Sequence, residues 1–104
     1  MIQFLKNLFG IGPSVNIEEI VANGAIIIDV RTKGEYQSGH LKNSVNIPLE
    51  ALPNNLSKLD KTKPIITCCA SGMRSSNAES LLKSYGFTDV YNGGSWASLK
   101  KFDA

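Results

Sequence analysis

Residues 25–30 read AIIIDV, and a second run of the same kind, PIITCC, occupies residues 64–69. Both runs are short, continuous and rich in β-branched apolar side chains, which is typical of strands buried on both faces of a parallel sheet. Two weaker strand patterns are SVNIPL at 44–49, which Pro48 halts, and TDVYN at 88–92. These segments are expected to form the strands of one sheet.

The segments between the strands have helical patterns. Residues 51–59, 74–85 and 95–102 carry apolar or small side chains at helical spacing. A shorter helix is expected over residues 17–22, because Asn16 belongs to a residue type that caps helix N-termini. Strands that alternate with helices indicate an α/β domain with a mainly parallel sheet and helices on both faces.

The first residues of the chain are interpreted as a separate element. Residues 1–13 are expected to form a short amphipathic helix with a connector, followed by a single domain over residues 14–104. The apolar positions at helical spacing are Ile2, Leu5, Leu8 and Phe9. So short a helix needs a cover for its apolar face, which is either the domain itself, a partner protein or a membrane surface.

The composition of the 104-residue chain is that of an ordinary globular protein, with 42% apolar and 19% charged residues and a net charge of +2. The basic residues are scattered and do not alternate with aromatic residues, so no nucleic-acid partner is expected. No stretch approaches the roughly 20 apolar residues of a membrane span, and the N-terminus lacks a signal-peptide pattern. We expect a cytoplasmic protein that is monomeric and does not enter a membrane.

Cys68 and Cys69 are the only cysteines of the sequence. The Cα atoms of adjacent residues are about 3.8 Å apart, below the range of roughly 4.4 to 6.8 Å for disulfides, so a bridge between them would be strained. With His40 as the single histidine, the set is too small and wrongly spaced for a zinc site. The thiols are expected to be free, which fits a reducing compartment.

A short loop follows the second strand run, at the place where open α/β sheets bind ligands. Cys69 ends the strand, residues 70–73 form the loop, and a helix is expected to begin near Arg74 or Ser75. Free N–H groups and the positive end of that helix, helped by Arg74, favour a thiolate in the loop. Neighbouring strand residues point to opposite faces, which places Cys69 in the loop and Cys68 in the core as an inert apolar side chain.

Three segments together resemble the rhodanese (sulfurtransferase) domain in its single-domain form. They are IIDVRTKGEYQSGHLKNSVNIPL at 27–49, CASGMRS at 69–75 and VYNGGSWAS at 90–98, and the resemblance covers residues 14–102. It implies a five-stranded parallel sheet flanked by helices. It also implies a catalytic cysteine that carries a persulfide between a sulfur donor and an acceptor, without a cofactor or a metal ion.

Carried across by position, the resemblance implies that Cys69 is the nucleophile and persulfide carrier. Backbone N–H groups of the loop would hold the persulfide or the oxyanion of a donor, and Arg74 would bind an anionic substrate. Asp29 and Arg31 match a motif at a strand end and are expected to support the site through a buried carboxylate and a salt bridge. The expected substrate-binding residues are Ala70, Ser71, Gly72, Met73, Arg74 and Ser75.

The other matched residues are interpreted as structural. Glu35, Tyr36 and His40 match the family segment E-[YF]-x-x-G-H, and His40 is expected to anchor a turn or loop. Residues 93–94, both glycine, match a turn that borders the family's site, and Trp96 is expected to pack in the core behind it.

Three functions remain open. The leading hypothesis is a sulfurtransferase that moves sulfur from thiosulfate or a persulfide donor to cyanide, a thiol or a protein acceptor. The second is a sulfur-relay or protein-binding module with weak thiosulfate turnover. A phosphatase or arsenate reductase is disfavoured, because such loops have five residues between cysteine and arginine and this loop has four, Ala70 to Met73. Cys68 is left as a packing residue or a redox partner.

Overall fold

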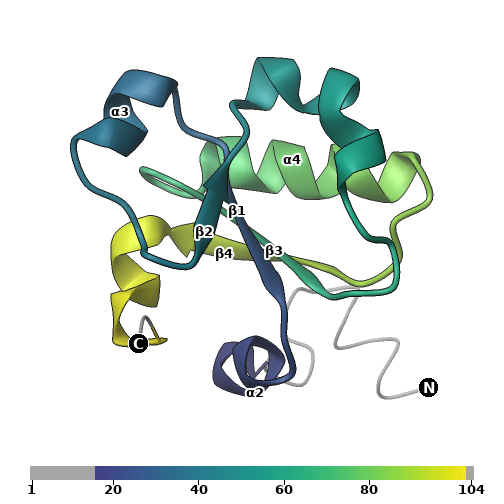
Figure 1. The fold of residues 1–104 in the computed structure, drawn as a ribbon, viewed down its shortest axis with the longest axis horizontal. Helices are drawn as coiled ribbons and strands as arrows, with labels where there is room; N and C mark the ends of the chain where they lie inside the picture. The colour runs from purple at the N-terminus through teal and green to yellow at the C-terminus, as the bar shows by residue number, and fades with distance from the viewer. Residues whose placement is uncertain (1–15, 103–104) are drawn as a thin grey trace.

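The computed structural model describes residues 16–102, in which four parallel strands form one sheet in the order β2-β1-β3-β4 (Figure 1). The predicted N-terminal helix lies outside the described residues, so the division between residues 1–13 and 14–104 stays a prediction. None of the helices within the described part is long and apolar enough to cross a membrane. The strands are β1 (Ile26–Asp29), β2 (Ser44–Asn46), β3 (Ile65–Cys69) and β4 (Val90–Ser95).

The expectation of a fifth strand, which came from the resemblance, is wrong for residues 16–102. The four strands observed there coincide with the four strand patterns of the sequence. A further strand would need another run of β-branched or alternating apolar residues to cover an edge of the sheet, and the segments between these strands have helical spacing or turn residues instead.

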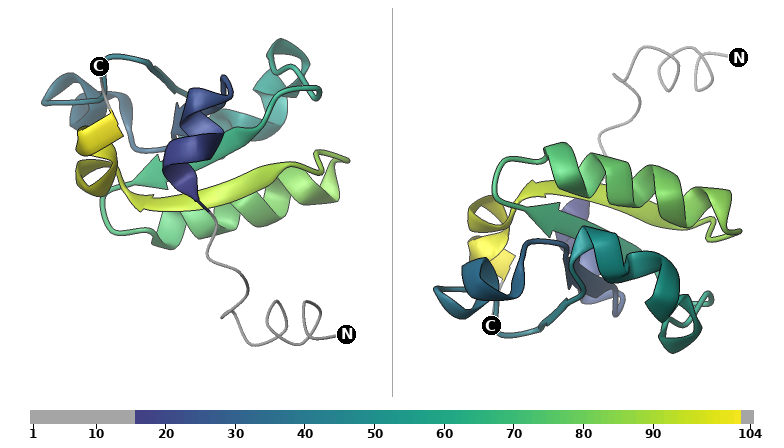
Figure 2. Two further views of the ribbon diagram at one scale, coloured as in Figure 1. Left: turned by 90° about the horizontal axis from the view of Figure 1, so that it is seen from below. Right: turned by 90° about the horizontal axis from the view of Figure 1, so that it is seen from above.

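Helices cover both faces of the sheet, as predicted. In Figures 1 and 2, α4 and η1 lie on one face, whereas α2 lies on the other. The segment predicted as a helix over 51–59 is a 3-10 helix over Leu49–Lys58, which contains Pro53, a residue without the N–H that an α-helix needs. The helices are α2 (Ile17–Ala22), α3 (Lys33–Gln37), η1 (Leu49–Lys58), α4 (Met73–Ser84) and η2 (Trp96–Phe102).

The central strand β3 separates two apolar cores, and all five of its residues are buried. Cys69 belongs to the core beneath α4 and η1, together with Leu52 and Leu82. Cys68 belongs to the core on the opposite face, together with Leu99 of η2. The prediction that adjacent strand residues send the two thiols to opposite faces is confirmed.

The two glycines at 93–94 lie inside β4, although the sequence predicted a turn there. Thr67 of β3 pairs with Asn92 and Cys69 pairs with Ser95, so β4 bulges at the two glycines. A side chain at Gly93 would lie 2.7 Å from Ile66 Cγ2. Glycine at this position therefore lets β4 pack closely against β3 where the two strands end.

Candidate active site

The candidate nucleophile Cys69 is the last residue of β3, and helix α4 begins four positions later at Met73. The sequence placed the start of this helix near Arg74 or Ser75. It begins earlier because Gly72 adopts a left-handed conformation, with φ of +103°, and accepts the first helical hydrogen bond from Ser76 N at 3.0 Å. This turn points the first N–H groups of the loop and helix back towards Cys69.

The thiol of Cys69 is surrounded by hydrogen-bond donors. The N–H of Gly72 donates to Sγ at 2.9 Å, and the N–H of Ser75 lies at 3.4 Å. Burial alone would raise the pKa of this thiol, but the hydrogen bond with the Ser75 side chain and the hydrogen bonds from the N–H groups of Ser75, Gly72 and Ser71 outweigh it, so the pKa is lowered. The site can therefore hold a thiolate, as predicted from the helix N-terminus.

Two residues pin the loop to β4. The Ser75 hydroxyl donates to Asn92 Oδ1 at 2.6 Å, and the Gly72 carbonyl is a second possible acceptor at 3.0 Å. Asn92 also accepts from Gly94 N at 2.9 Å. Sequence reasoning included Ser75 in the loop and missed Asn92. One signal could have indicated Asn92: it lies in the strand VYNGGS, and the end of that strand lies beside the end of β3.

Arg74 does not lie free in the loop. Its Nη1 and Nη2 donate to the two carboxylate oxygens of Glu35 at 2.7 and 2.9 Å, which joins α4 to α3. Arg74 was expected to help stabilise the thiolate, but hydrogen bonds from Ser75 and the loop backbone are the main causes of the lowered Cys69 pKa. Glu35 was interpreted as structural, and its contact with a loop residue brings it to the site.

Asp29 and Arg31 form a buried pair beneath the site. Arg31 Nη2 donates to Asp29 Oδ2 at 2.7 Å, and both side chains are at most 5% exposed. Arg31 also donates to the carbonyl oxygens of Glu35 at 3.2 Å and Gly39 at 2.7 Å. Its guanidinium stacks over Trp96, 4.6 Å from the ring centroid. The pair fixes the segment that presents Glu35 to Arg74.

The other thiol and the histidine lie apart from this arrangement. Burial raises the pKa of Cys68 to about 12. His40 Nδ1 lies 2.8 Å from the Tyr36 carbonyl, and its ring stacks on that of Tyr36. These contacts make His40 an anchor of the turn after α3, which was the interpretation from the sequence. No group of three metal-ligating side chains occurs within residues 16–102.

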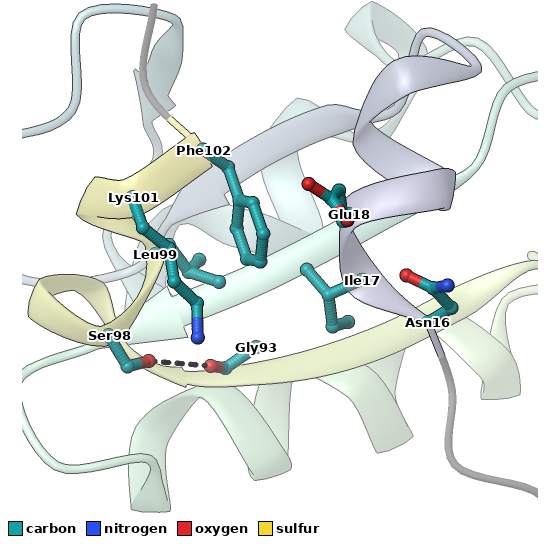
Figure 3. A pocket seen from close by; sticks show the side chains of 8 residues that line it. All are labelled: Asn16, Ile17, Glu18, Gly93, Ser98, Leu99, Lys101 and Phe102. Atoms are coloured by element: carbon teal, nitrogen blue, oxygen red, sulfur yellow. Dashed lines mark hydrogen bonds between the residues drawn. The ribbon is translucent and has the colours of Figure 1, made fainter.

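Two cavities of the described structure lie on different faces. A cavity of about 510 Å³ opens between α2, β4 and η2 (Figure 3), and it contains none of the predicted site residues. A smaller cavity of about 270 Å³ lies beside the loop and is lined by Arg74. Its other lining residues are Val30, Thr32, Pro48, Leu49 and Glu50. Of these two cavities, the smaller one therefore lies next to the loop that follows Cys69.

Comparison with known proteins agrees with this geometry. A family model described as Rhodanese-like domain matches residues 15–100. The chain is 31% identical over 80 residues to a thiosulfate sulfurtransferase GlpE of Pseudomonas savastanoi pv. phaseolicola. The aligned region covers 77% of this chain and 76% of the relative. It is 29% identical over 87 residues to a tRNA sulfurtransferase of Thermoplasma acidophilum, which covers 84% of this chain but 17% of that relative.

Solved structures show the same fold. A structure described as rhodanese with anions from E. coli has a TM-score of 0.67 and 30% identity, and covers 71% of this chain and 89% of the other. The reduced CoADR-RHD of Bacillus anthracis has a TM-score of 0.71 and 36% identity, and covers 83% of this chain and 15% of the other. The chain therefore belongs to the rhodanese-like sulfurtransferase family.

Proposed function

We propose that Cys69 carries sulfane sulfur from thiosulfate or a persulfide donor to cyanide, a thiol or a protein acceptor. The observation that carries this proposal is the pair of backbone N–H groups, from Gly72 and Ser75, that point at Cys69 Sγ from 2.9 and 3.4 Å. Donors in fixed positions stabilise negative charge on sulfur without reorganisation during the reaction. The activity named for the GlpE relative supports the choice of thiosulfate as a donor.

The chemistry is a double displacement. The Cys69 thiolate attacks the outer sulfur of thiosulfate, the S–S bond of the donor breaks, and sulfite leaves with the bonding electron pair. Cys69 then holds a persulfide. The acceptor, cyanide or a thiolate, attacks the outer persulfide sulfur, takes it as thiocyanate or a new persulfide, and returns Cys69 to its thiolate form. No net oxidation occurs, and no cofactor is needed.

The loop residues would have two roles in this scheme. The backbone N–H groups of the segment from Ala70 to Met73, together with Ser75, would hold the persulfide and the charge on the donor. Arg74 would bind the anionic end of the donor. The side chain of Met73 is 76% exposed, so an incoming acceptor would meet it early. Asp29 and Arg31 would support the loop indirectly, through the backbone of α3.

Intact-protein mass spectrometry after thiosulfate treatment tests the proposal. We expect a gain of about 32 Da, one sulfur atom, in the wild type and in Cys68→Ser, and no gain in Cys69→Ser. Cys68 is a matched control because it is a neighbouring buried thiol whose pKa is raised to about 12. Persulfide formation that depends on Cys68, or aryl phosphate hydrolysis that depends on Cys69, would contradict the assignment.

A sulfur relay that serves a protein donor is the second candidate. Two observations favour it: Cys69 is fully buried beneath its loop, and the charge of Arg74 is engaged by Glu35. Both features would slow a small dianion such as thiosulfate. A relay would show slow loading by thiosulfate beside fast loading by the cysteine persulfide of a partner protein. Equal rates for the two donors would favour the first candidate.

The proposed setting is the cytoplasm. Cys68 and Cys69 are both free and buried. Free thiols fit a reducing compartment, and the proposed reaction needs Cys69 in its reduced form. Fractionation of cells that produce the tagged protein would test the location, and recovery with the membrane fraction would contradict it.

A further inference from the structure

The guanidinium of Arg74 and the carboxylate of Glu35 form a two-pronged ion pair at the start of the loop. Each oxygen of Glu35 accepts from a different terminal nitrogen of Arg74, at 2.7 and 2.9 Å. This fork-to-fork geometry is the one that arginine uses for carboxylate, phosphate and related oxyanions. The proposed anion-binding residue of the loop is therefore already occupied by an anion that belongs to the protein.

Glu35 is held in this position from its own side. Its Oε1 accepts from the Thr32 N–H at 3.0 Å and from the Thr32 hydroxyl at 3.1 Å, as part of the capping box that begins α3. Its backbone carbonyl accepts from the buried Arg31 at 3.2 Å. The carboxylate is fixed by its helix as well as by Arg74, so it remains near the guanidinium when another anion arrives.

The charge of Glu35 persists at all physiological pH values. The hydrogen bond from Arg74, followed by that from the Thr32 N–H, lowers the pKa of Glu35 to about 2. A dianionic donor that approaches Arg74 must displace Glu35 or lie beside it. Displacement breaks the Arg74–Glu35 ion pair, and a place beside Glu35 brings two negative groups together, so both lower the affinity for the donor. A donor with a neutral group at the same place avoids that cost.

We propose that Glu35 is a specificity-determining residue that competes with anionic donors for Arg74, and so selects monoanionic organic sulfane-sulfur donors over thiosulfate. The proposal rests on the proposed role of Cys69 as the sulfur carrier. The cavity of about 270 Å³ next to Arg74 fits the organic part of such a donor, because Val30, Pro48 and Leu49 give it apolar walls.

Benzenethiosulfonate and thiosulfate form a suitable pair of probes. Both transfer their outer sulfur to a thiolate, and the leaving groups are benzenesulfinate and sulfite, respectively. Thiosulfate carries charge on its sulfonate end, whereas benzenethiosulfonate has a neutral sulfonyl group and an apolar ring there. In the unmodified protein we expect a KM for benzenethiosulfonate at least about threefold lower than that for thiosulfate. The reverse order would overturn the proposal.

The variant Glu35→Gln distinguishes two roles of Glu35: competition with the donor for Arg74, and orientation of Arg74 for the donor. Glutamine also forms a capping box, so α3 keeps its cap while the resident charge is removed. We expect the thiosulfate KM to fall about three- to tenfold, with kcat and the KM of benzenethiosulfonate within about twofold. A thiosulfate KM that rises or stays unchanged would show that Glu35 orients Arg74 instead. Glu79→Gln is the matched control, because it removes the carboxylate that pairs with Lys83 on α4 at 3.0 Å.

Binding measured without turnover keeps this inference separate from the proposed function. In a Cys69→Ser background, calorimetric titration measures the Kd for thiosulfate. This Kd should fall about three- to tenfold when Glu35→Gln is added. In an Arg74→Gln background the tightening should largely vanish, since no guanidinium remains to be freed. Tightening that survives Arg74→Gln would indicate general repulsion and overturn competition. If Glu35→Gln tightens thiosulfate binding as expected but the protein with Cys69 intact never gains sulfur, only the proposed role of Cys69 is contradicted.

Discussion

The hydroxyl of Ser75 donates to Asn92 Oδ1 at 2.6 Å and joins the first turn of α4 to β4 beside the candidate nucleophile. The same hydroxyl oxygen lies 3.5 Å from Cys69 Sγ, close enough to accept from the thiol. A serine hydroxyl has one proton to donate, so Asn92 and a Cys69 thiolate compete for it. The protonation of Cys69 is thereby linked to a residue on a different strand.

Asn92→Asp should raise the pKa of Cys69. An aspartate oxygen would hold the Ser75 proton more strongly than an amide oxygen, and it would add a negative charge near the thiolate. The ultraviolet absorbance of the thiolate, titrated against pH, measures the change. Asn55→Asp is the control, because Asn55 donates to Ala51 within η1, away from the loop. An unchanged or lower Cys69 pKa in Asn92→Asp would contradict the link.

In the wild type, the thiolate titration should contain one transition below the ordinary cysteine value of about 8.5. The transition belongs to Cys69, whose pKa is lowered by hydrogen bonds, while Cys68 stays protonated because its pKa is about 12. A lowered pKa means that the thiolate persists to lower pH, so thiolate-dependent loading should reach its plateau at a lower pH than it would for a free cysteine. Cys68→Ser should keep this transition and Cys69→Ser should lose it. A midpoint above the ordinary value would show that burial outweighs the hydrogen bonds.

The strands and the loop were predictable from local patterns. The run AIIIDV became β1 and PIITCC became β3, because short, continuous β-branched runs are typical of strands buried on both faces of a sheet. The loop followed from the end of β3 and the helical spacing after it. The fifth strand failed because it had no run of its own in residues 16–102 and was inferred from resemblance alone.

Contacts between distant segments were less predictable. Glu35 and Arg74 are 39 residues apart, and Ser75 and Asn92 are 17 apart. Spacing along the chain indicates which residues share a helix face or a strand face, but it does not indicate which of two polar side chains meet across elements. Thus Arg74 was expected to bind the substrate, and the structure pairs it with Glu35, which had been interpreted as structural.

Gly72→Ala should destabilise the protein by about 1–2 kcal/mol and slow sulfur loading. Gly72 has φ of +103°, a conformation that strains a residue with a Cβ, and the added Cβ would lie 3.4 Å from Gly94 Cα. Relief of the strain would turn the Gly72 N–H away from Cys69. Urea denaturation and mass spectrometry measure the two effects. Gly34→Ala is the control, since an added Cβ there has nothing within 4 Å. Equal stability of the two variants would contradict the argument.

Asp29→Asn should be the most destabilising of these changes, by about 3–5 kcal/mol. Asp29 is fully buried and accepts from Arg31 through both carboxylate oxygens. Asparagine keeps the shape but leaves the guanidinium, which is itself buried, without a compensating charge. Urea denaturation monitored by the fluorescence of Trp96, which stacks on Arg31, measures the loss. Asp60→Asn, a change at an exposed carboxylate that bonds to the nearby Thr62 in its loop, should change stability little. A loss below about 1 kcal/mol in Asp29→Asn would show that the hydrogen bonds of Arg31 to the carbonyls of Glu35 and Gly39 hold its charge without Asp29.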